Sequence, residues 1–587
     1  MMGSREEERL LEDGTIKNES LGPYTGDGSV DIHGSPVLRH NTGNWRACPF
    51  ILRAVCCERM AYYGISTNLV TYLTKILHEG NASAAQIVTT WQGTCCLTPL
   101  LGALLADAYW GRYWTIAAFS AVYFIGMGVL PLSTLVSAFK PPSCAGSICP
   151  FASPAQYASF FFGIYLIALG AGTIKVCVYS FGVDQFDDTS PTERMKKSSF
   201  FNWLYFSNNI GACVSSMLLV WIQDNAGWAL GFGISTVFMV IAIGSFFSGT
   251  VRYRFQKPGG SPLTRMCQVI VASVRKLNVK VPYDSSLLFE VPDQNSAIPG
   301  SRKLEHTDEF TFLDKAATVS DFDAKSSNFS DPWKLCTVTQ VEELKILFRV
   351  FPIWATLIVL SIVYCQIFST FIEQGMTLDT RLGSFTIPPA SLSIFVMISV
   401  IFLVPIYDLI FVPIAWKCTG HERGFSELQR MRIGLFVSLF SLAAAALVEI
   451  RRLEIARANH LVYNTFTLVP MSIFWQIPQY FLVGAAEVFT YIGQTEFFYD
   501  QSPDAMRSLY SALSLLISAL GYYLNSFILT IVIAVTKKGG SPGWIPDNLN
   551  EGHLNYFFWL LAGLSLLNLV VYVACAGRYK CKKVVSR

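Results

Sequence analysis

Charged residues are scarce in this chain. Asp, Glu, Lys and Arg make up 14% of its 587 residues, whereas hydrophobic residues make up 52%. Soluble domains carry roughly a quarter of their residues as charged side chains. A soluble protein with so few charges could not cover its surface, so lipid must be the solvent for much of this chain. The net charge of +3 is too small to indicate a nucleic-acid partner.

Several chemical signatures are also missing. The sequence shows no nucleophile–base constellation, no cluster of metal ligands and no phosphate-binding loop. The fifteen cysteines are scattered, and none forms paired CxxC motifs with zinc-like spacing. We therefore expect no enzyme activity, no cofactor and no metal. Residues 1–46 are polar and acidic, unlike a cleavable signal peptide, so the first apolar segment is expected to direct membrane insertion.

Long apolar runs dominate what is present. A helix needs about 20 largely apolar residues to span a bilayer. The sequence predicts an all-α integral membrane protein with twelve such helices, near Cys48–Leu77, Ile87–Tyr109, Trp114–Phe139, Ala155–Val178, Phe200–Gln223, Trp228–Thr250, Glu343–Ile372, Pro389–Ala415, Ile433–Ile450, Met471–Phe498, Ala505–Thr536 and Tyr556–Ala576.

A long polar stretch divides the twelve segments into two groups of six. The predicted divisions are an N-terminal tail (1–46), a six-helix bundle (47–250), a linker (251–342), a second six-helix bundle (343–577) and a C-terminal tail (578–587). Lys and Arg concentrate in the linker and the C-terminal tail, which predicts that both termini are cytoplasmic. The tripeptide beginning at Asn81 then lies on the opposite face, where an N-glycan could attach.

Two six-helix halves joined by a cytoplasmic linker indicate a major-facilitator architecture. In such a fold the substrate site lies at the midplane between the halves, and rocking of the halves alternates access to it. The turn at residues 102–112 resembles the signature loop of that superfamily. The resemblance implies that Asp107 and Arg112 form a cytoplasmic charge latch.

Four ionisable residues lie well inside predicted helices: Glu58, Arg59, Lys175 and Glu487. Each is expensive to insert, at roughly 2.5–3.5 kcal/mol, and is therefore a functional candidate. Glu58 and Arg59 are adjacent, about 100° apart around the helix, so we expect them not to pair with each other. Lys175 is then the expected mate of Glu58, which leaves Arg59 and Glu487 facing each other across the two halves.

Such charges could simply be ion pairs that hold helices together. Their contribution by both halves favours substrate or proton binding instead. Arg59 can hold a carboxylate in a bidentate fork, and Glu487 can accept an ammonium group. A cavity with one positive and one negative end suits a zwitterion.

Three motifs add a family resemblance. Residues 57–64 (CERMAYYG), residues 201–211 (FNWLYFSNNIG) and residues 498–508 (FYDQSPDAMRS) are similar to the signatures of the proton-dependent oligopeptide (peptide/nitrate) transporter family. The likeness extends from about Gly43 to the C-terminus and is greatest to the plant peptide-transporter branch.

The resemblance implies roles for matched positions. Arg59 would bind the peptide carboxylate and Glu487 the amino terminus, and Glu58, Lys175 and Glu487 would carry proton coupling. Tyr62, Tyr63 and Asn209 would line the site, and Trp475 would wall a side-chain pocket. Tyr364 stands where a dual-affinity nitrate member has a nitrate-binding histidine, which argues against nitrate. The implied function is transport of di- and tripeptides, coupled to protons, across a lipid bilayer.

The sequence also departs from the family pattern. Val55 replaces an expected Glu three residues before Glu58, Arg53 replaces a small residue, and Val176 replaces a proline on helix four. Asn208 stands where an aliphatic residue is expected. Coupling needs a group whose pKa changes between conformations, so these departures leave several hypotheses open. The first hypothesis is a proton-driven peptide carrier, and the second is a peptide facilitator without proton coupling. The third is a carrier of another small solute, such as nitrate or a hormone, and the fourth is a paralogue that binds substrate without transporting it.

The N-terminal tail carries a sorting pattern. Glu6, Leu10 and Leu11 fit the acidic dileucine motif that sorting adaptors recognise. In plant relatives such tails accompany delivery to the vacuolar membrane, so the tonoplast is predicted over the plasma membrane.

Overall fold

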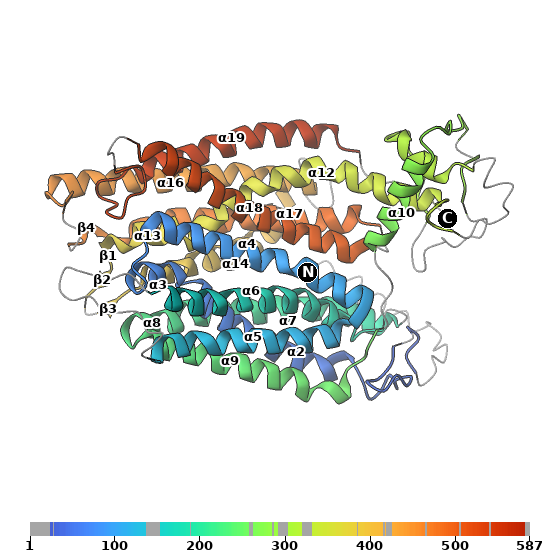
Figure 1. Cartoon of the computed structure of the whole chain (residues 1–587), viewed down its shortest axis with the longest axis horizontal. Helices are drawn as coiled ribbons and strands as arrows, with labels where there is room; N and C mark the ends of the chain where they lie inside the picture. The colour runs from blue at the N-terminus through green and yellow to red at the C-terminus, as the bar shows by residue number, and fades with distance from the viewer. Residues whose placement is uncertain are drawn as a thin grey trace.

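The computed structural model describes residues 24–27, 29–136, 153–187, 190–256, 262–284, 287–290, 303–319, 331–383, 385–411, 413–414, 417, 425–463, 467–503, 506–538 and 542–580. Its long helices lie side by side along one axis (Figure 1). Helix α10 (Pro262–Arg275) and the turn η5 (Thr311–Ala317) lie at one end of this axis, which we call the linker end. Four short strands mark the other end, which we call the strand end.

The N-terminal half contains six membrane-spanning segments. In chain order their elements are α2 (Asn44–Ser66) with α3 (Leu69–Lys75), α4 (Asn81–Leu105) with the π turn η1 (Ala106–Trp110), α5 (Arg112–Leu135), α6 (Pro154–Val183), α7 (Pro191–Val214) with the π turn η2 (Ser215–Leu219) and α8 (Val220–Asn225), and α9 (Trp228–Ser248) with η3 (Thr250–Arg252).

The C-terminal half contains six more. Its elements are α12 (Val338–Cys365) with η6 (Gln366–Phe368) and α13 (Thr370–Met376), η7 (Pro389–Ser393) with α14 (Ile394–Ile406) and the π turn η8 (Tyr407–Phe411), α16 (Glu427–Ala458), η9 (Ile473–Gln476) with α17 (Ile477–Gln501), α18 (Arg507–Thr536) and α19 (Leu554–Arg578). The predicted fold class, twelve membrane helices in two halves, is confirmed.

The strands form two small sheets at the strand end. Strand β1 (Leu378–Asp379) pairs in parallel with β4 (Val469–Ser472), with Leu378 opposite Val469. Strand β2 (Arg381–Leu382) pairs antiparallel with β3 (Phe385–Thr386), with Arg381 opposite Thr386. Both sheets belong to connections of the C-terminal half, so they fasten that half's loops above its helices.

Two of the predicted continuous helices are broken near the strand end. The first breaks at Thr67 and Asn68, where the Asn68 carboxamide donates to Gln223 Oε1 at 3.1 Å on the neighbouring α8. The seventh breaks at Ser369, whose backbone is not helical and whose hydroxyl donates to Cys365 O at 3.0 Å. At the first break Gln223 Nε2 also donates to the backbone oxygen of Gly64, and such polar partners for freed backbone groups let a membrane helix break.

The two halves contact each other along α4 and α18 and again at the strand end. Gly93 of α4 lies so close to α18 that a Cβ there would meet Ala519 O at 3.3 Å. At the strand end, Trp221 and Phe385 stack with centroids 6.4 Å apart, and the Ser391 hydroxyl donates to Ser216 O at 2.8 Å. The structure therefore has the strand end closed by contacts between the halves.

Candidate substrate and proton site

The site begins with three helices that are unusually polar for membrane segments. Within the described residues, nine helices are long and apolar enough to cross a membrane by themselves, and α2, α4 and α17 are not among them. These three helices carry Arg59, Gln92 and Glu487, respectively. Intramembrane polar groups face the bundle interior or a water-filled cavity, so the least apolar helices are the ones that build the site.

Glu58 and Arg59 form an ion pair, contrary to our expectation from the sequence. Arg59 Nε donates to Glu58 Oε2 at 2.5 Å, and the two side chains are 4% and 8% exposed. Both side chains are long enough to bend across the 100° that separates them, and burial makes an unpaired charge costly. The second carboxylate oxygen, Glu58 Oε1, is buried and has no hydrogen-bond partner among the described residues.

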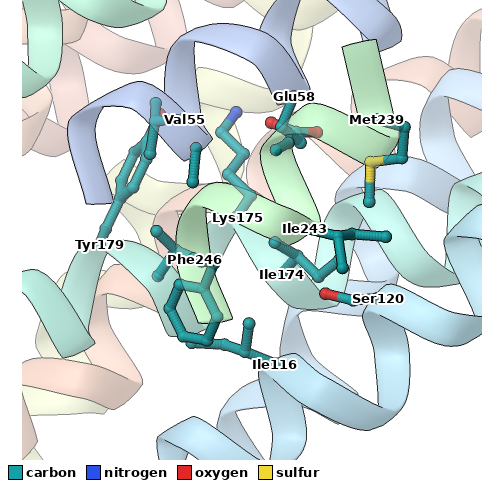
Figure 2. Close-up of a pocket in the computed structure, with 13 residues that line it drawn as sticks. Val55, Glu58, Ile116, Ser120, Ile174, Lys175, Tyr179, Met239, Ile243 and Phe246 are labelled. Atoms are coloured by element: carbon teal, nitrogen blue, oxygen red, sulfur yellow. The ribbon is translucent and has the colours of Figure 1, made fainter. Parts of the chain in front are cut away.

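Lys175 is not the ion-pair partner of Glu58 that the sequence predicted. Both residues line one pocket between α2, α5, α6 and α9, whose other lining is almost entirely apolar. Figure 2 shows the Lys175 side chain rising between Val55 and Glu58. Lys175 interacts electrostatically with Arg59, Glu58 and, across the halves, Glu487, but it forms no hydrogen bond or ion pair within the described chain. Its position is therefore set by packing and by these electrostatic interactions.

Arg59 is fixed from two sides. Its guanidinium lies 5.2 Å from the ring centroid of Tyr62, a cation–π contact. Tyr62 stacks on Trp91 at 5.9 Å, and its hydroxyl donates to Gln92 Oε1 at 2.8 Å. On the other side α7 approaches α2 at Gly211, where a Cβ would lie 2.8 Å from Arg59 Cβ. Only glycine permits this approach, so the predicted helix-five motif positions the arginine.

Glu487 stands on the other half without an ion-pair partner in the described chain. It is half-buried on α17 and interacts electrostatically with Lys175. Tyrosines from both halves surround it at electrostatic range: Tyr63, Tyr205, Tyr364, Tyr491 and Tyr522. The structure thus brings together Arg59, Lys175 and Glu487 with the predicted Tyr62, Tyr63 and Tyr364.

Sequence reasoning missed four tyrosines of this shell. Tyr179 interacts with Arg59, and its hydroxyl donates to Asn208 Oδ1 at 3.1 Å. Tyr205, Tyr491 and Tyr522 lie near Glu487. Tyr179 and Tyr491 follow Lys175 and Glu487 by four positions, and residues so spaced share a helix face. This spacing was the signal in the sequence that could have identified Tyr179 and Tyr491. The hydrogen bond from Tyr179 also gives a structural role to Asn208, which departs from the family pattern.

Of two further predicted lining residues, Trp475 lies at the strand end and Asn209 lies one turn from Tyr205 on α7. Trp475 is 59% exposed in the turn that precedes α17 at the strand end. It precedes Glu487 by twelve positions, about 18 Å along a helix, so the structure does not bring it to Glu487, and its role as the wall of a side-chain pocket stays a prediction. Asn209 is half-buried, and its side-chain nitrogen donates to Tyr205 O at 2.8 Å on its own helix.

The remaining predicted residues fall outside this site. Arg112 forms an ion pair with Asp184 of α6, and the side chain of Asp107 lies outside the described residues, as do Glu6, Leu10 and Leu11. Asn81 begins α4, and its carboxamide donates to Asp547 O at 2.9 Å. In this conformation the side-chain nitrogen that would carry a glycan is thus engaged.

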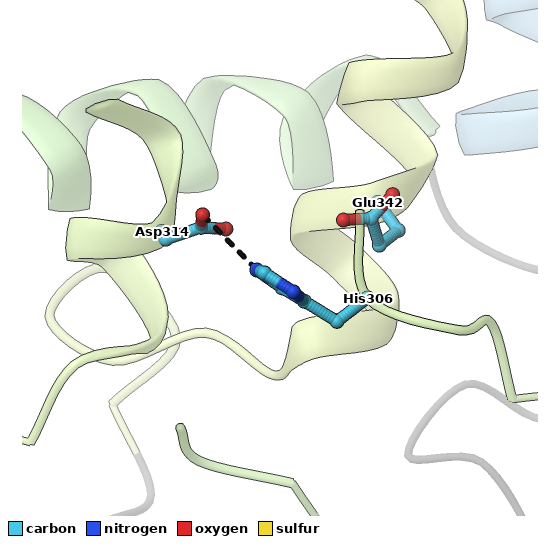
Figure 3. A group of neighbouring side chains, drawn as sticks. All are labelled: His306, Asp314 and Glu342. Atoms are coloured by element: carbon cyan, nitrogen blue, oxygen red, sulfur yellow. Dashed lines mark hydrogen bonds and ion pairs between the residues drawn. The ribbon is translucent and has the colours of Figure 1, made fainter. Parts of the chain in front are cut away.

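A second charged cluster joins the linker to α12 (Figure 3). His306, Asp314 and Glu342 are close enough together to hold a metal ion. However, the buried Lys345 ammonium lies 2.8 Å from Asp314 Oδ1 and 2.9 Å from Glu342 Oε1, and Arg349 Nη2 lies 3.3 Å from Glu342 Oε2, so two cations balance the two acids. At the rim, a hydrogen bond from Lys580 holds the pKa of Glu309 below its ordinary value of 4.5, with the charge of Arg349 acting in the same direction. The cluster fastens the linker to the bundle.

Helices of two halves that meet around buried, opposite charges define a multi-pass membrane transporter of the major-facilitator type rather than an enzyme. The model of the POT family matches residues 113–545, and the chain belongs to this family.

Known proteins support both levels of this assignment. The chain is 63% identical over 587 residues to Protein NRT1/PTR FAMILY 8.3 of Arabidopsis thaliana, which covers 100% of each chain. It superposes with a TM-score of 0.66 on an auto-inhibited POT family peptide transporter (22% identity, 92% of this chain and 98% of that one). The POT family transporter PepTSo gives a TM-score of 0.67 (21% identity, 91% and 98%). At these identities the solved structures show a shared fold.

Proposed function

We propose that this protein is a proton-coupled symporter of di- and tripeptides that works by alternating access. The observation that carries the proposal is the placement of Arg59 and Glu487 on opposite halves, within one shell of tyrosines. A short peptide is a zwitterion, so its carboxylate and its ammonium group fit the two ends. Solved relatives include a POT family peptide transporter and a POT family transporter in complex with 5-aminolevulinic acid, itself an amino acid.

The Glu58–Arg59 ion pair supplies a route for coupling. While Glu58 is ionised it occupies the guanidinium that a substrate carboxylate needs. Protonation of Glu58 removes that competitor, so proton binding and peptide binding favour each other. We propose Tyr62, Tyr63, Tyr364 and Asn209 as further lining groups. Lys175 and Glu487 complete the proton path, because their mutual interaction joins the halves electrostatically.

Val55 favours one alternative, transport without proton coupling. Val55 is 4% exposed and lines the pocket that holds Glu58 and Lys175 (Figure 2), at the position where the family pattern has an acid. Glu58 is then the single acid beside Arg59 on α2. If Glu58 stays paired through the cycle, the protein is a facilitator.

The deciding experiment is uptake of a labelled dipeptide in oocytes between pH 5.5 and 7.5. The protein is directed to the plasma membrane by Leu10→Ala and Leu11→Ala, and surface biotinylation provides the control for delivery. Uptake that rises in acid with inward current supports the symporter. Uptake that is independent of pH supports the facilitator. Protein at the surface without uptake contradicts peptide transport and turns the search to nitrate, hormones or other small solutes.

We also propose the cellular arrangement. Both termini and the linker (251–342) lie in the cytoplasm, between bundles at 47–250 and 343–577, and an adaptor that reads Glu6, Leu10 and Leu11 delivers the protein to the vacuolar membrane. Arg112, paired with Asp184, belongs to the cytoplasmic latch with Asp107. Tags on residues 1–46 that are protected from protease in intact vacuoles would contradict this orientation.

A further inference from the structure

Another buried acid of the transmembrane region, Glu373, has no hydrogen-bond or ion-pair partner among the described residues. Glu373 of α13 is 0% exposed, and both of its carboxylate oxygens are buried without a hydrogen-bond partner among the described residues. Its neighbour Gln374 behaves in the opposite way. The Gln374 carboxamide donates to Glu449 Oε2 at 2.8 Å and accepts from Gln476 Nε2 at 2.9 Å. Those bonds fasten α13 to the C-terminal half.

Glu373 points away from the half that carries it. Phe371, two positions earlier, packs its ring on Tyr480 and Phe558 of the C-terminal half. A two-residue step rotates a side chain by about 200°, so Glu373 lies on the opposite face of α13. That face meets α3 of the N-terminal half, where the Thr74 hydroxyl contacts Met376 Sδ at 3.9 Å. The carboxyl group is therefore buried by the closure of the two halves.

Few charges surround this carboxyl group. Asp547, in the segment between α18 and α19, interacts with it electrostatically and repels its ionised form. Asp547 also touches the N-terminal half, since its backbone oxygen accepts from Asn81 Nδ2 at 2.9 Å. On α3 the titratable residues are the exposed Lys75 and the buried Tyr72, and His78 and Glu79 follow α3, whereas η6, η7 and η9 contain none. No described cation forms an ion pair with Glu373.

We propose that Glu373 is a second proton-binding site, which must be protonated for the strand end to close. A carboxylate without partners in an apolar interior is far costlier than a neutral carboxyl group. When the halves part at the strand end, water reaches Glu373 and its proton dissociates; when they close, one proton is taken up again. This inference rests on the proposed alternating access and adds a gate proton to it. It differs from the Glu58 route because Glu373 competes for no substrate group.

Ionisation of Glu373 in the open state alone would make the ratio of open to closed protein depend on pH. If the closed state holds Glu373 neutral and the open state ionises it, the ratio of open to closed protein rises up to tenfold for each pH unit above the ordinary carboxyl pKa. A variant with a permanently neutral side chain loses this dependence. The expected signature is therefore a pH-dependent ratio between wild type and variant.

The experiment measures access to the contact between α3 and α13. Thr74→Cys is placed in the full-length protein in nanodiscs, and its labelling by a membrane-impermeant maleimide is followed by peptide-resolved mass spectrometry from pH 5.5 to 7.5. The same reporter is built with Glu373→Gln and with Glu454→Gln. Glu454 is the matched control because it is an exposed acid at the strand end, paired only with Arg451. The labelling rate of the wild-type background is divided by that of each variant at the same pH, so the pH dependence of the thiol's own reactivity cancels.

We expect the wild-type rate divided by the Glu373→Gln rate to rise up to tenfold per pH unit, and the wild-type to Glu454→Gln ratio to stay constant. Glu373→Met repeats the test without new hydrogen-bond donors, and it should melt at a higher temperature than wild type. A constant wild-type to Glu373→Gln ratio overturns the gate proton even if peptide uptake is proton-driven. Labelling that follows the expectation while the wild type transports no peptide leaves the gate proton intact and rejects the proposed substrate.

Discussion

The two halves place their charges at the site in different ways. In the N-terminal half, Arg59 is paired with Glu58 and is further held by Tyr62 and by the approach of α7 at Gly211, whereas Lys175 forms no ion pair in the described chain. In the C-terminal half, Glu487 stands alone among tyrosines. One half thus carries an excess positive charge and the other an excess negative charge. A neutral zwitterion can balance both at once, whereas an anion such as nitrate balances only one.

Removing the positive side should have the largest effect. Arg59→Ala removes the guanidinium of this shell and leaves Glu58 without its ion-pair partner, which is strongly destabilising in a buried pair, by about 3–5 kcal/mol. We expect dipeptide uptake to fall by at least about 100-fold, since 1.4 kcal/mol is tenfold. Arg59→Lys retains the charge without the bidentate fork and should recover only part of the activity. Wild-type uptake by Arg59→Ala at equal surface level would contradict the assignment.

Neutralising the negative side should have a selective effect. Glu487→Gln should weaken uptake of dipeptides with a free amino terminus by about tenfold, the range of a lost charge-assisted hydrogen bond. Uptake of N-acetylated dipeptides, which lack the ammonium group, should change little. Competition uptake with both substrates measures the difference. An equal loss for both would show that Glu487 does not receive the amino terminus.

Restoring the acid that the family pattern has at position 55 should strengthen the pH dependence of uptake. Val55→Glu places a second acid one helical turn before Glu58 and Arg59, so uptake should depend more steeply on pH, changing several-fold more between pH 5.5 and 7.5. Val55→Gln is the matched control because it has the same shape without a titratable proton. Identical pH profiles for the two variants would count against residue 55 as a determinant of proton coupling.

A smaller effect is expected from changing Tyr62, the residue whose ring contacts the Arg59 guanidinium. Tyr62→Phe keeps the ring beneath Arg59 but removes the hydrogen bond to Gln92 Oε1. A neutral hydrogen bond contributes about 1 kcal/mol, so the affinity for dipeptide should fall by a few-fold while maximal uptake is retained. Concentration-dependent uptake separates the two quantities. A collapse of maximal uptake would indicate that Tyr62 does more than position Arg59.

The smallest effect concerns the linker, whose outer ion pair contrasts with the buried pairs of the site. The pKa of Glu309 is lowered by Lys580, so the stabilisation it gives is present above its ordinary value of 4.5 and disappears as the pH falls through the lowered pKa. Limited proteolysis should therefore release the linker more readily below pH 4.5. Lys580→Ala should weaken this dependence slightly, as expected for an exposed pair.

The sequence predicted the architecture because hydropathy is summed over many residues and tolerates local errors. The positions of Arg59, Lys175 and Glu487 also followed from the cost of burying charge. The pairing of Glu58 with Arg59 did not, because helical rotation describes where Cβ atoms point and not how far long side chains bend. The distance between Trp475 and Glu487 did not follow either, because a motif gives the order of residues along the chain but not their depth along the helix axis.

Two tyrosines of the shell, Tyr205 and Tyr522, and the unpartnered state of Glu373 could not be predicted from one sequence. Tyr205 and Tyr522 lie on α7 and α18, whereas Glu487 lies on α17, so only the tertiary structure brings them near Glu487. Glu373 follows an apolar run and resembles an ordinary helix-terminal acid in the sequence. Its lack of partners emerges only when α3 of the other half covers it.

The contact at Gly93 has a mechanical consequence. Gly93 lies twelve residues from either end of α4, and the residues it meets, Ala519, Tyr522 and Tyr523, lie at the middle of α18. The helix therefore extends about 18 Å to either side of Gly93, so this contact is a suitable pivot for a rocking motion of the two halves. A tilt of about 10° would move the two tips about 3 Å in opposite directions for helices of this length. A small rocking motion about Gly93 can thus separate the two halves at the strand end while it brings them together at the linker end.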